Sequence, residues 1–179
     1  ADNVLKGSKK EVLEQVREQI RKFKADNKLE QLIVLWSANT ERYCEITDGV
    51  HDTAANLLKG IDEGHPEISP SIIYAVASIL EGVPYINGSP QNTFVPGLIE
   101  LAVQHKVPIM GDDFKTGQTK FKTVLSDFLI SSGLKLTAVV SYNHLGNNDG
   151  LNLSFESCFR SKQISKSSVI DDMVRLNPI

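Results

Sequence analysis

The order of apolar and polar segments predicts an α/β fold with a mainly parallel sheet. Apolar runs at 32–36, 84–86, 107–110 and 134–142 have the length and composition of buried strands. Segments with helical periodicity lie between them, and this alternation is typical of a parallel sheet covered by helices. The run at 134–142 is the longest of the expected strands.

Local start and stop signals place the helices. Ser8 and Glu11 have the spacing of a capping box ahead of a helical apolar pattern. Ser69 followed by Pro70 predicts the start of another helix, which Gly82 ends. The remaining helices are expected over about 52–60, 96–105, 118–132 and 163–175.

Composition narrows the class of protein. Of 179 residues, 41% are hydrophobic and 23% are charged, as in globular chains. The net charge of −3 gives no broad basic surface to attract nucleic acid or anionic lipid. The longest apolar stretch, 72–80, is too short to span a bilayer, and the polar segment 1–10 is no signal peptide.

Cysteine and histidine usage predicts neither a disulfide framework nor a structural metal. The two cysteines, Cys44 and Cys158, are far apart, which favours a reducing compartment. The four histidines have no metal-ligand spacing. These observations predict a soluble, cytoplasmic protein with no metal cofactor.

Four polar loops follow the four expected strands, at 37–43, 87–92, 111–118 and 143–150. Ligands of open parallel sheets bind outside the carboxyl ends of the strands. We therefore expect the four loops to line one crevice. The alternative is that their Asn, Asp and Gly residues only serve tight turns.

The third loop resembles a phosphate-binding loop but does not match its template. Five residues separate Gly111 from Gly117, and Gln118 stands where a lysine is required. The start of the helix there still offers free N–H groups to a phosphate. Asp112 and Asp113 are better suited to hydroxyl groups of a ribose or sugar.

Lys162 and Lys166 are the strongest catalytic candidates. In a helix, residues four apart share one face, and two neighbouring ammonium groups lower at least one pKa. A lysine tuned in this way acts as an acid or base near neutrality. The alternative is a solvated basic face. His144 is expected to be an orienting or packing residue and not a base, and Cys158 is expected to be structural.

Five segments strongly resemble the eukaryotic-type myo-inositol-1-phosphate synthases. Together they extend the resemblance over essentially the whole chain. They are LWSANTERY (35–43), NGSPQNTFVPG (87–97), GDDFKTGQTK (111–120), SYNHLGNNDG (141–150) and FRSKQISKSSVIDDM (159–173).

This resemblance implies an NAD-dependent isomerase that converts glucose 6-phosphate to inositol 3-phosphate. The implied steps are oxidation at C5, enolisation, aldol closure of C1 onto C6, and reduction. The family further implies a cytoplasmic homotetramer that serves inositol and phospholipid biosynthesis.

The resemblance also implies roles for individual residues. The catalytic residues would be Lys162 and Lys166. The substrate would contact Gln118, Asn143 and the backbone of Leu145. NAD would contact Ser37, Ala38, Asn39, Thr40, Gly88, Asp113, Thr116, Asn147, Asn148, Asp149 and Lys162.

By the same resemblance, residues 1–117 would form the second half of a Rossmann-like NAD-binding domain. Residues 118–179 would begin an α+β catalytic and tetramerisation domain. The Gly-rich dinucleotide fingerprint of the family is absent from the sequence, and so is its C-terminal continuation. We therefore expect an internal fragment that is inactive by itself. The alternatives are another NAD-dependent oxidoreductase on a related fold and a non-catalytic interaction fragment.

Overall fold

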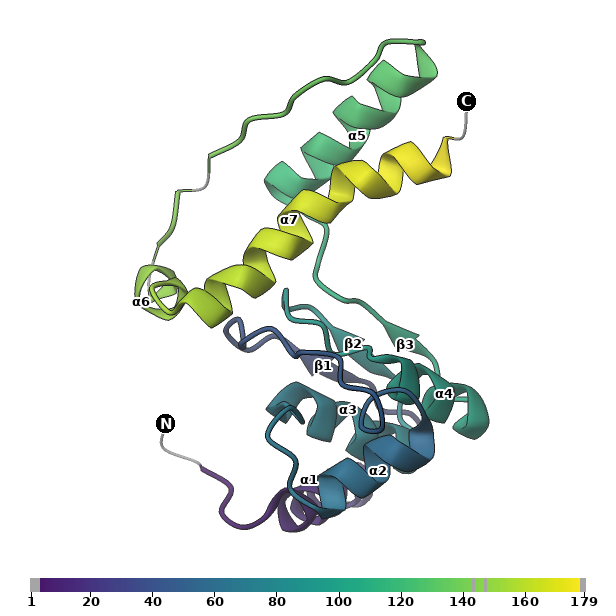
Figure 1. Cartoon of the computed structure of the whole chain (residues 1–179). Helices are drawn as coiled ribbons and strands as arrows, with labels where there is room; N and C mark the ends of the chain where they lie inside the picture. Colours follow the sequence, from purple (N-terminus) through teal and green to yellow (C-terminus); the bar gives the residue numbers. More distant parts are fainter. Residues whose placement is uncertain (1–3, 143, 147, 178–179) are drawn as a thin grey trace.

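A computed structural model describes residues 4–142, 144–146 and 148–177. Figure 1 shows two layers: a small sheet with helices α1–α4 on one face, and a separate group of helices, α5–α7, beyond the edge at which the strands end. The chain crosses from the first layer to the second after β3.

The sheet is parallel, as predicted. In the described part of the chain it has three strands in the order β1-β2-β3: Val34–Trp36, Tyr85–Asn87 and Ile109–Met110. Leu35 is in register with Ile86, which is in register with Met110. All three carboxyl ends therefore meet at one edge, and the polar loops follow from that edge.

Four helices cover the sheet: α1 (Lys9–Asp26), α2 (Ala54–Asp62), α3 (Pro70–Leu80) and α4 (Pro96–His105). The predicted capping box of Ser8 and Glu11 is present at α1. The Ser69 side chain caps α3 by accepting from the backbone N–H of Ile72. These caps satisfy amides that the helix itself leaves unpaired.

The apolar core belongs entirely to this first layer. Among the described residues, its buried members lie between Leu13 and Val107. Leu57, Ile72 and Leu98, one from each of three helices, are fully buried. The core therefore holds the strands and the starts of their loops on a rigid base.

The second layer consists of α5 (Gly117–Ser131), α6 (Asp149–Leu153) and α7 (Glu156–Leu176), with α5 and α7 crossing each other (Figure 1). Its buried positions are largely polar. They are Thr119, Lys122, Ser126 and Ile130 on α5, Leu153 on α6, and Ser161, Ser165 and Val169 on α7. No helix among the described residues is both long and apolar enough to cross a membrane.

The prediction of a strand at 134–142 is wrong. The segment leaves α5 as an extended, mostly exposed connection, and no described strand pairs with it (Figure 1). An apolar, β-branched composition favours a strand only where a neighbour accepts its backbone hydrogen bonds. Helix α7 also begins seven residues before the predicted 163, and α6 was not predicted.

Candidate functional site

The loops that follow the three strands, Asp149 of α6 and two lysines of α7 line one crevice of about 410 Å³. It lies where the carboxyl edge of the sheet faces α6 and the first half of α7. Predicted site residues that line it are Ser37, Ala38, Asn39, Thr40, Gly88, Asp113, Thr116, Asp149, Lys162 and Lys166. Ser89, Pro90 and Phe114 line it as well, although sequence reasoning did not single them out.

Hydrogen bonds tie the walls of the crevice together. The Gly88 N–H donates to the Trp36 carbonyl at 2.9 Å, and the Ser89 hydroxyl donates to the Ala38 carbonyl at 2.5 Å. From α6, the Asn152 amide donates to the Thr40 carbonyl at 3.0 Å. The loop after β1 is thus held from both layers.

Gly88 is required by close packing. A Cβ at this position would lie 2.2 Å from the ring of Phe114, which is too close for any side chain without a shift of the ring. The Phe114 N–H also donates to the Gly88 carbonyl at 3.3 Å. The absence of a side chain lets the loops after β2 and β3 touch at the floor of the crevice.

Asp113 joins the loop after β3 to helix α7. Its carboxylate accepts a hydrogen bond from the Ser165 hydroxyl and lies 3.8 Å from the Lys115 ammonium. Lys115 also donates to the Ser165 hydroxyl at 3.2 Å. The backbone φ of Asp113 is 68°, in the left-handed region that aspartate tolerates better than most residues.

Asp112 does not line the crevice, contrary to the expectation that both aspartates suit ligand hydroxyls. Its carboxylate accepts from the Asn87 side-chain amide at 2.6 Å and from the Phe94 N–H at 3.2 Å. Burial raises the pKa of Asp112 to about 6, against the lowering effect of these hydrogen bonds. Asp112 anchors the loop, and only Asp113 remains available to a ligand.

Lys162 and Lys166 share one face of α7 and enter the crevice together with Asp113. The Lys162 ammonium lies 3.5 Å from the Asp149 carboxylate, and the Lys166 ammonium donates to the Thr119 hydroxyl at 2.8 Å. The pKa of Lys166 is lowered, as predicted for one of the pair. Burial is the largest cause, and the like charge of Lys162 is a smaller one that Asp113 opposes.

The same two lysines line a neighbouring cavity of about 370 Å³. Leu145, Tyr142 and Lys122 are among the other residues that form it. Gln118 lies beside this cavity: its side-chain amide donates to the Tyr142 carbonyl at 2.8 Å, and its buried side-chain oxygen has no partner among the described residues.

Asn148 is predicted to contact NAD but lines neither cavity. Asn148 is exposed at the start of α6. Asn143 and Asn147 lie outside the described residues. His144 is exposed, and Cys158 is a partly buried free thiol.

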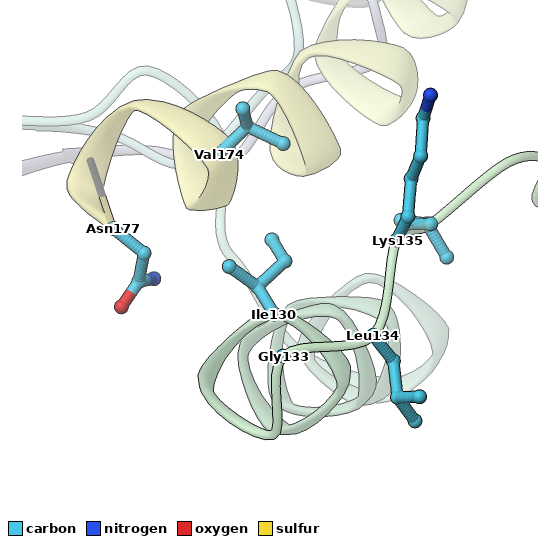
Figure 2. Close-up of a pocket in the computed structure, with 7 residues that line it drawn as sticks. Ile130, Gly133, Leu134, Lys135, Val174 and Asn177 are labelled. Atoms are coloured by element: carbon cyan, nitrogen blue, oxygen red, sulfur yellow. The ribbon is translucent and has the colours of Figure 1, made fainter. Parts of the chain in front are cut away.

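Another pocket, at the far end of α5, has none of this chemistry. Figure 2 shows Ile130 of α5 and Val174 of α7 pointing toward one another, and Leu134, Lys135 and Asn177 are also among the residues that line the pocket. No carboxylate or second cation lines it among the described residues. The described part of the chain also has no group of three or more His, Cys, Asp or Glu side chains placed to hold a metal ion.

The family model for an NAD-binding domain described as myo-inositol-1-phosphate synthase matches residues 1–177. This chain belongs to the myo-inositol-1-phosphate synthase family. The resemblance of the five segments is thereby confirmed, and with it the NAD cofactor of the family's domain.

Individual members of the family match the chain from end to end. Inositol-3-phosphate synthase 1-A of Xenopus laevis is 64% identical over all 179 residues, which make up 32% of that protein. The Dictyostelium discoideum inositol-3-phosphate synthase is 61% identical over the same residues, 35% of its length. The chain thus spans about a third of the length of these relatives.

A solved structure agrees with the fold. The crystal structure of inositol-3-phosphate synthase from Caenorhabditis elegans, at 2.30 Å resolution, superposes with a TM-score of 0.93 and 62% identity. The match covers 99% of this chain and 35% of that one. The α/β fold and both layers described above are therefore those of the synthase family.

Proposed function

We propose that this chain carries the catalytic lysines and one wall of the NAD site of an inositol-3-phosphate synthase. Such an enzyme converts D-glucose 6-phosphate to 1D-myo-inositol 3-phosphate without net oxidation. The observation that carries the proposal is the meeting of Lys162 and Lys166 with Asp113 and the strand-end loops in one crevice. The names and high identity of the relatives support the same activity.

The residues of the crevice fit NAD. Ser37, Asn39 and Thr40 offer hydroxyl and amide groups at the carboxyl edge of the sheet, where dinucleotides bind in parallel α/β folds. Asp113 offers a carboxylate to ribose hydroxyls, and Gly88 also lines the crevice. The remaining contacts proposed for NAD are Ala38, Thr116, Asp149 and Lys162, together with Asn147 and Asn148 of the fourth loop.

The chemistry that NAD supplies when bound is reversible hydride uptake from C5 of the sugar. Lys162 and Lys166 would handle the protons and charge that accompany it. One lysine accepts the proton of the C5 hydroxyl and later returns it. The substrate's own phosphate would accept the proton that C6 loses to make the aldol nucleophile. An ammonium group beside the C5 oxygen would stabilise the enolate that forms.

Substrate contacts are proposed for Gln118, Asn143 and the Leu145 backbone. The position of Leu145 in a cavity that also contains Lys162 and Lys166 supports this assignment. The buried, unpartnered side-chain oxygen of Gln118 supports it too, because a sugar hydroxyl could satisfy that oxygen.

Substitution of Lys162 in the full-length enzyme tests the proposal. Lys162→Ala should lower inositol phosphate formation from glucose 6-phosphate by about 10²–10⁴-fold, the usual contribution of one acid–base group. Lys120→Ala, at an exposed lysine on α5, is the matched control and should retain wild-type activity. Unchanged activity in Lys162→Ala, or net NADH formation by the wild type, would contradict the proposed reaction.

We further propose a domain boundary at residue 117, with residues 1–117 in the NAD-binding domain and 118–179 in the catalytic and tetramerisation domain. The confinement of the apolar core to the first layer supports this boundary. A cytoplasmic homotetramer that serves phospholipid biosynthesis, and weak NAD binding by the 179 residues alone, belong to the same proposal. Titration with NAD, of the 179-residue chain and of the full-length enzyme, tests the difference in NAD affinity. Light scattering of the full-length enzyme tests the tetramer.

A further inference from the structure

Lys122 is a buried cation on α5 whose ammonium points at the backbone of the catalytic helix. Only 9% of the residue is exposed, and its Nζ donates to the Lys166 carbonyl at 2.7 Å. No carboxylate lies within 4 Å of this ammonium among the described residues. Lys122 lines the cavity that also contains Lys162 and Lys166.

Stability does not account for a charge at this position. Burying an ammonium group without a carboxylate partner is costly, and a neutral side chain of similar length often leaves a protein equally or more stable. The other polar residues buried on this face of α5 are the neutral Thr119 and Ser126. The charge of Lys122 therefore calls for an explanation in the chemistry of the cavity.

Lys166 is held to α5 at two points. Its carbonyl accepts from Lys122, and its ammonium donates to the hydroxyl of Thr119, one helical turn earlier on α5. The first contact fixes the backbone of Lys166, and the second fixes the ammonium group at the tip of its side chain. A side chain fixed at both ends samples few rotamers and keeps its reactive nitrogen in place.

We propose that Lys122 is a positioning residue for Lys166: it ties the turn of α7 that carries Lys166 to α5 and places a fixed positive charge beside the cavity. This inference rests on the catalytic role of Lys166 in the proposed function. It adds to that function a residue that acts through Lys166 and not on the sugar itself.

The charges around Lys166 give the inference a measurable sign. Asp113 and Lys115 face it from the loop before α5, Lys122 from α5 and Lys162 from its own helix, while Asp149 of α6 lies beside Lys162. Burial and the three lysines lower the pKa of Lys166, and Asp113 raises it. Removal of the Lys122 charge should therefore raise the pKa of Lys166.

The test is the pH profile of the full-length enzyme with Lys122→Met, which removes the charge and the hydrogen-bond donor but keeps an unbranched side chain of similar size. We expect kcat to fall by roughly tenfold to 10²-fold, with a smaller change in KM, because misplacement of a reacting group costs rate before binding. The limb of the kcat profile that depends on Lys166 should move to higher pH. Lys122→Arg should retain most of kcat, and the exposed Lys120→Met should match the wild type in both respects.

Thermal unfolding separates positioning from a merely structural role. Lys122→Met should keep or raise Tm, and a lowered Tm with an unmoved pH profile would overturn the inference. If Lys122→Met does not fold, Lys122→Gln is measured in the same way, and failure of both to fold also overturns it.

The variant Lys166→Ala distinguishes this inference from the function on which it rests. Loss of activity in Lys166→Ala together with wild-type kcat and pH profile in Lys122→Met would refute only the role of Lys122. Full activity in Lys166→Ala would refute the catalytic assignment itself.

Discussion

The two layers of the molecule are built on different principles. The sheet layer encloses a continuous apolar core, with side chains such as Leu57 and Leu98 completely buried. In the second layer, α5 and α7 meet largely through hydroxyl groups and one buried ammonium, while Phe121 and Phe128 of α5 are 68% and 61% exposed. Apolar burial therefore stabilises the first layer far more than the second.

This difference matters for the site that lies between the layers. The sheet layer supplies loops anchored on a packed base, which suits the recognition of a cofactor by fixed groups. The helical layer supplies the lysines, held by hydrogen bonds to neutral and charged partners. Polar contacts of this kind set pKa values and side-chain positions, whereas apolar contacts set stability.

The largest expected difference between the two layers is in how a substitution changes the free energy of unfolding of the 179-residue chain. Leu57→Ala should lower the free energy of unfolding by about 2–5 kcal/mol, since it leaves a cavity in the core. Phe121→Ala, at an exposed position on α5, should change it by less than about 0.5 kcal/mol. Urea denaturation measures both, and equal losses in the two variants would show that stability is shared by the layers.

A smaller, pH-dependent effect is expected from Asp112, which anchors the loop between the layers. Its pKa is raised from 3.8 to about 6 in the folded chain, so the folded state binds the proton more tightly than the unfolded state. The resulting stability is fully present below pH 3.8 and is lost as the pH rises through about 6.

Comparison with Asp112→Asn isolates this contribution, because asparagine can still accept from Asn87 but does not titrate. Between pH 4 and pH 7 the wild type should lose up to about 3 kcal/mol relative to the variant. Urea unfolding at several pH values measures the difference. Curves that run parallel over this range would mean that Asp112 has an ordinary pKa.

The smallest effect is expected at an exposed ion pair that joins α7 to the loop after β1. Arg160 of α7 pairs with Glu45 and lies over the ring of Tyr43, 4.8 Å from its centroid. Both members of the ion pair are about half exposed, so a double-mutant cycle of Arg160→Ala and Glu45→Ala should give a coupling of roughly 0.2–1 kcal/mol. The coupling should fall in high salt. A coupling that does not depend on salt would indicate that this ion pair is more shielded from solvent than its exposed fractions imply.

Much of the first layer was predictable from local signals. Ser69 and Pro70 mark the start of α3, and the helix predicted over 96–105 has the observed bounds of α4. The site was predictable in part. Parallel strands bring the loops that follow them to one edge of the sheet, and a spacing of four residues puts Lys162 and Lys166 on one face of a helix. Lys122 was missed, although it lies two residues after the segment 111–120. Ser165 lies within the segment 159–173, but its hydrogen bond to Asp113 was not predicted.

By itself, the sequence determined two helix caps, the parallel direction of the strands, the motifs of the family and the pairing of two lysines on one helical face. These features depend on interactions between residues close in the chain or on a fixed backbone period. Only the tertiary structure decided that 134–142 is no strand, that Asp112 faces inward while Asp113 faces the crevice, and that burial is the main cause of the lowered pKa of Lys166. Each of these outcomes depends on which distant segment lies alongside, because strand pairing and desolvation both require neighbours that local sequence does not specify.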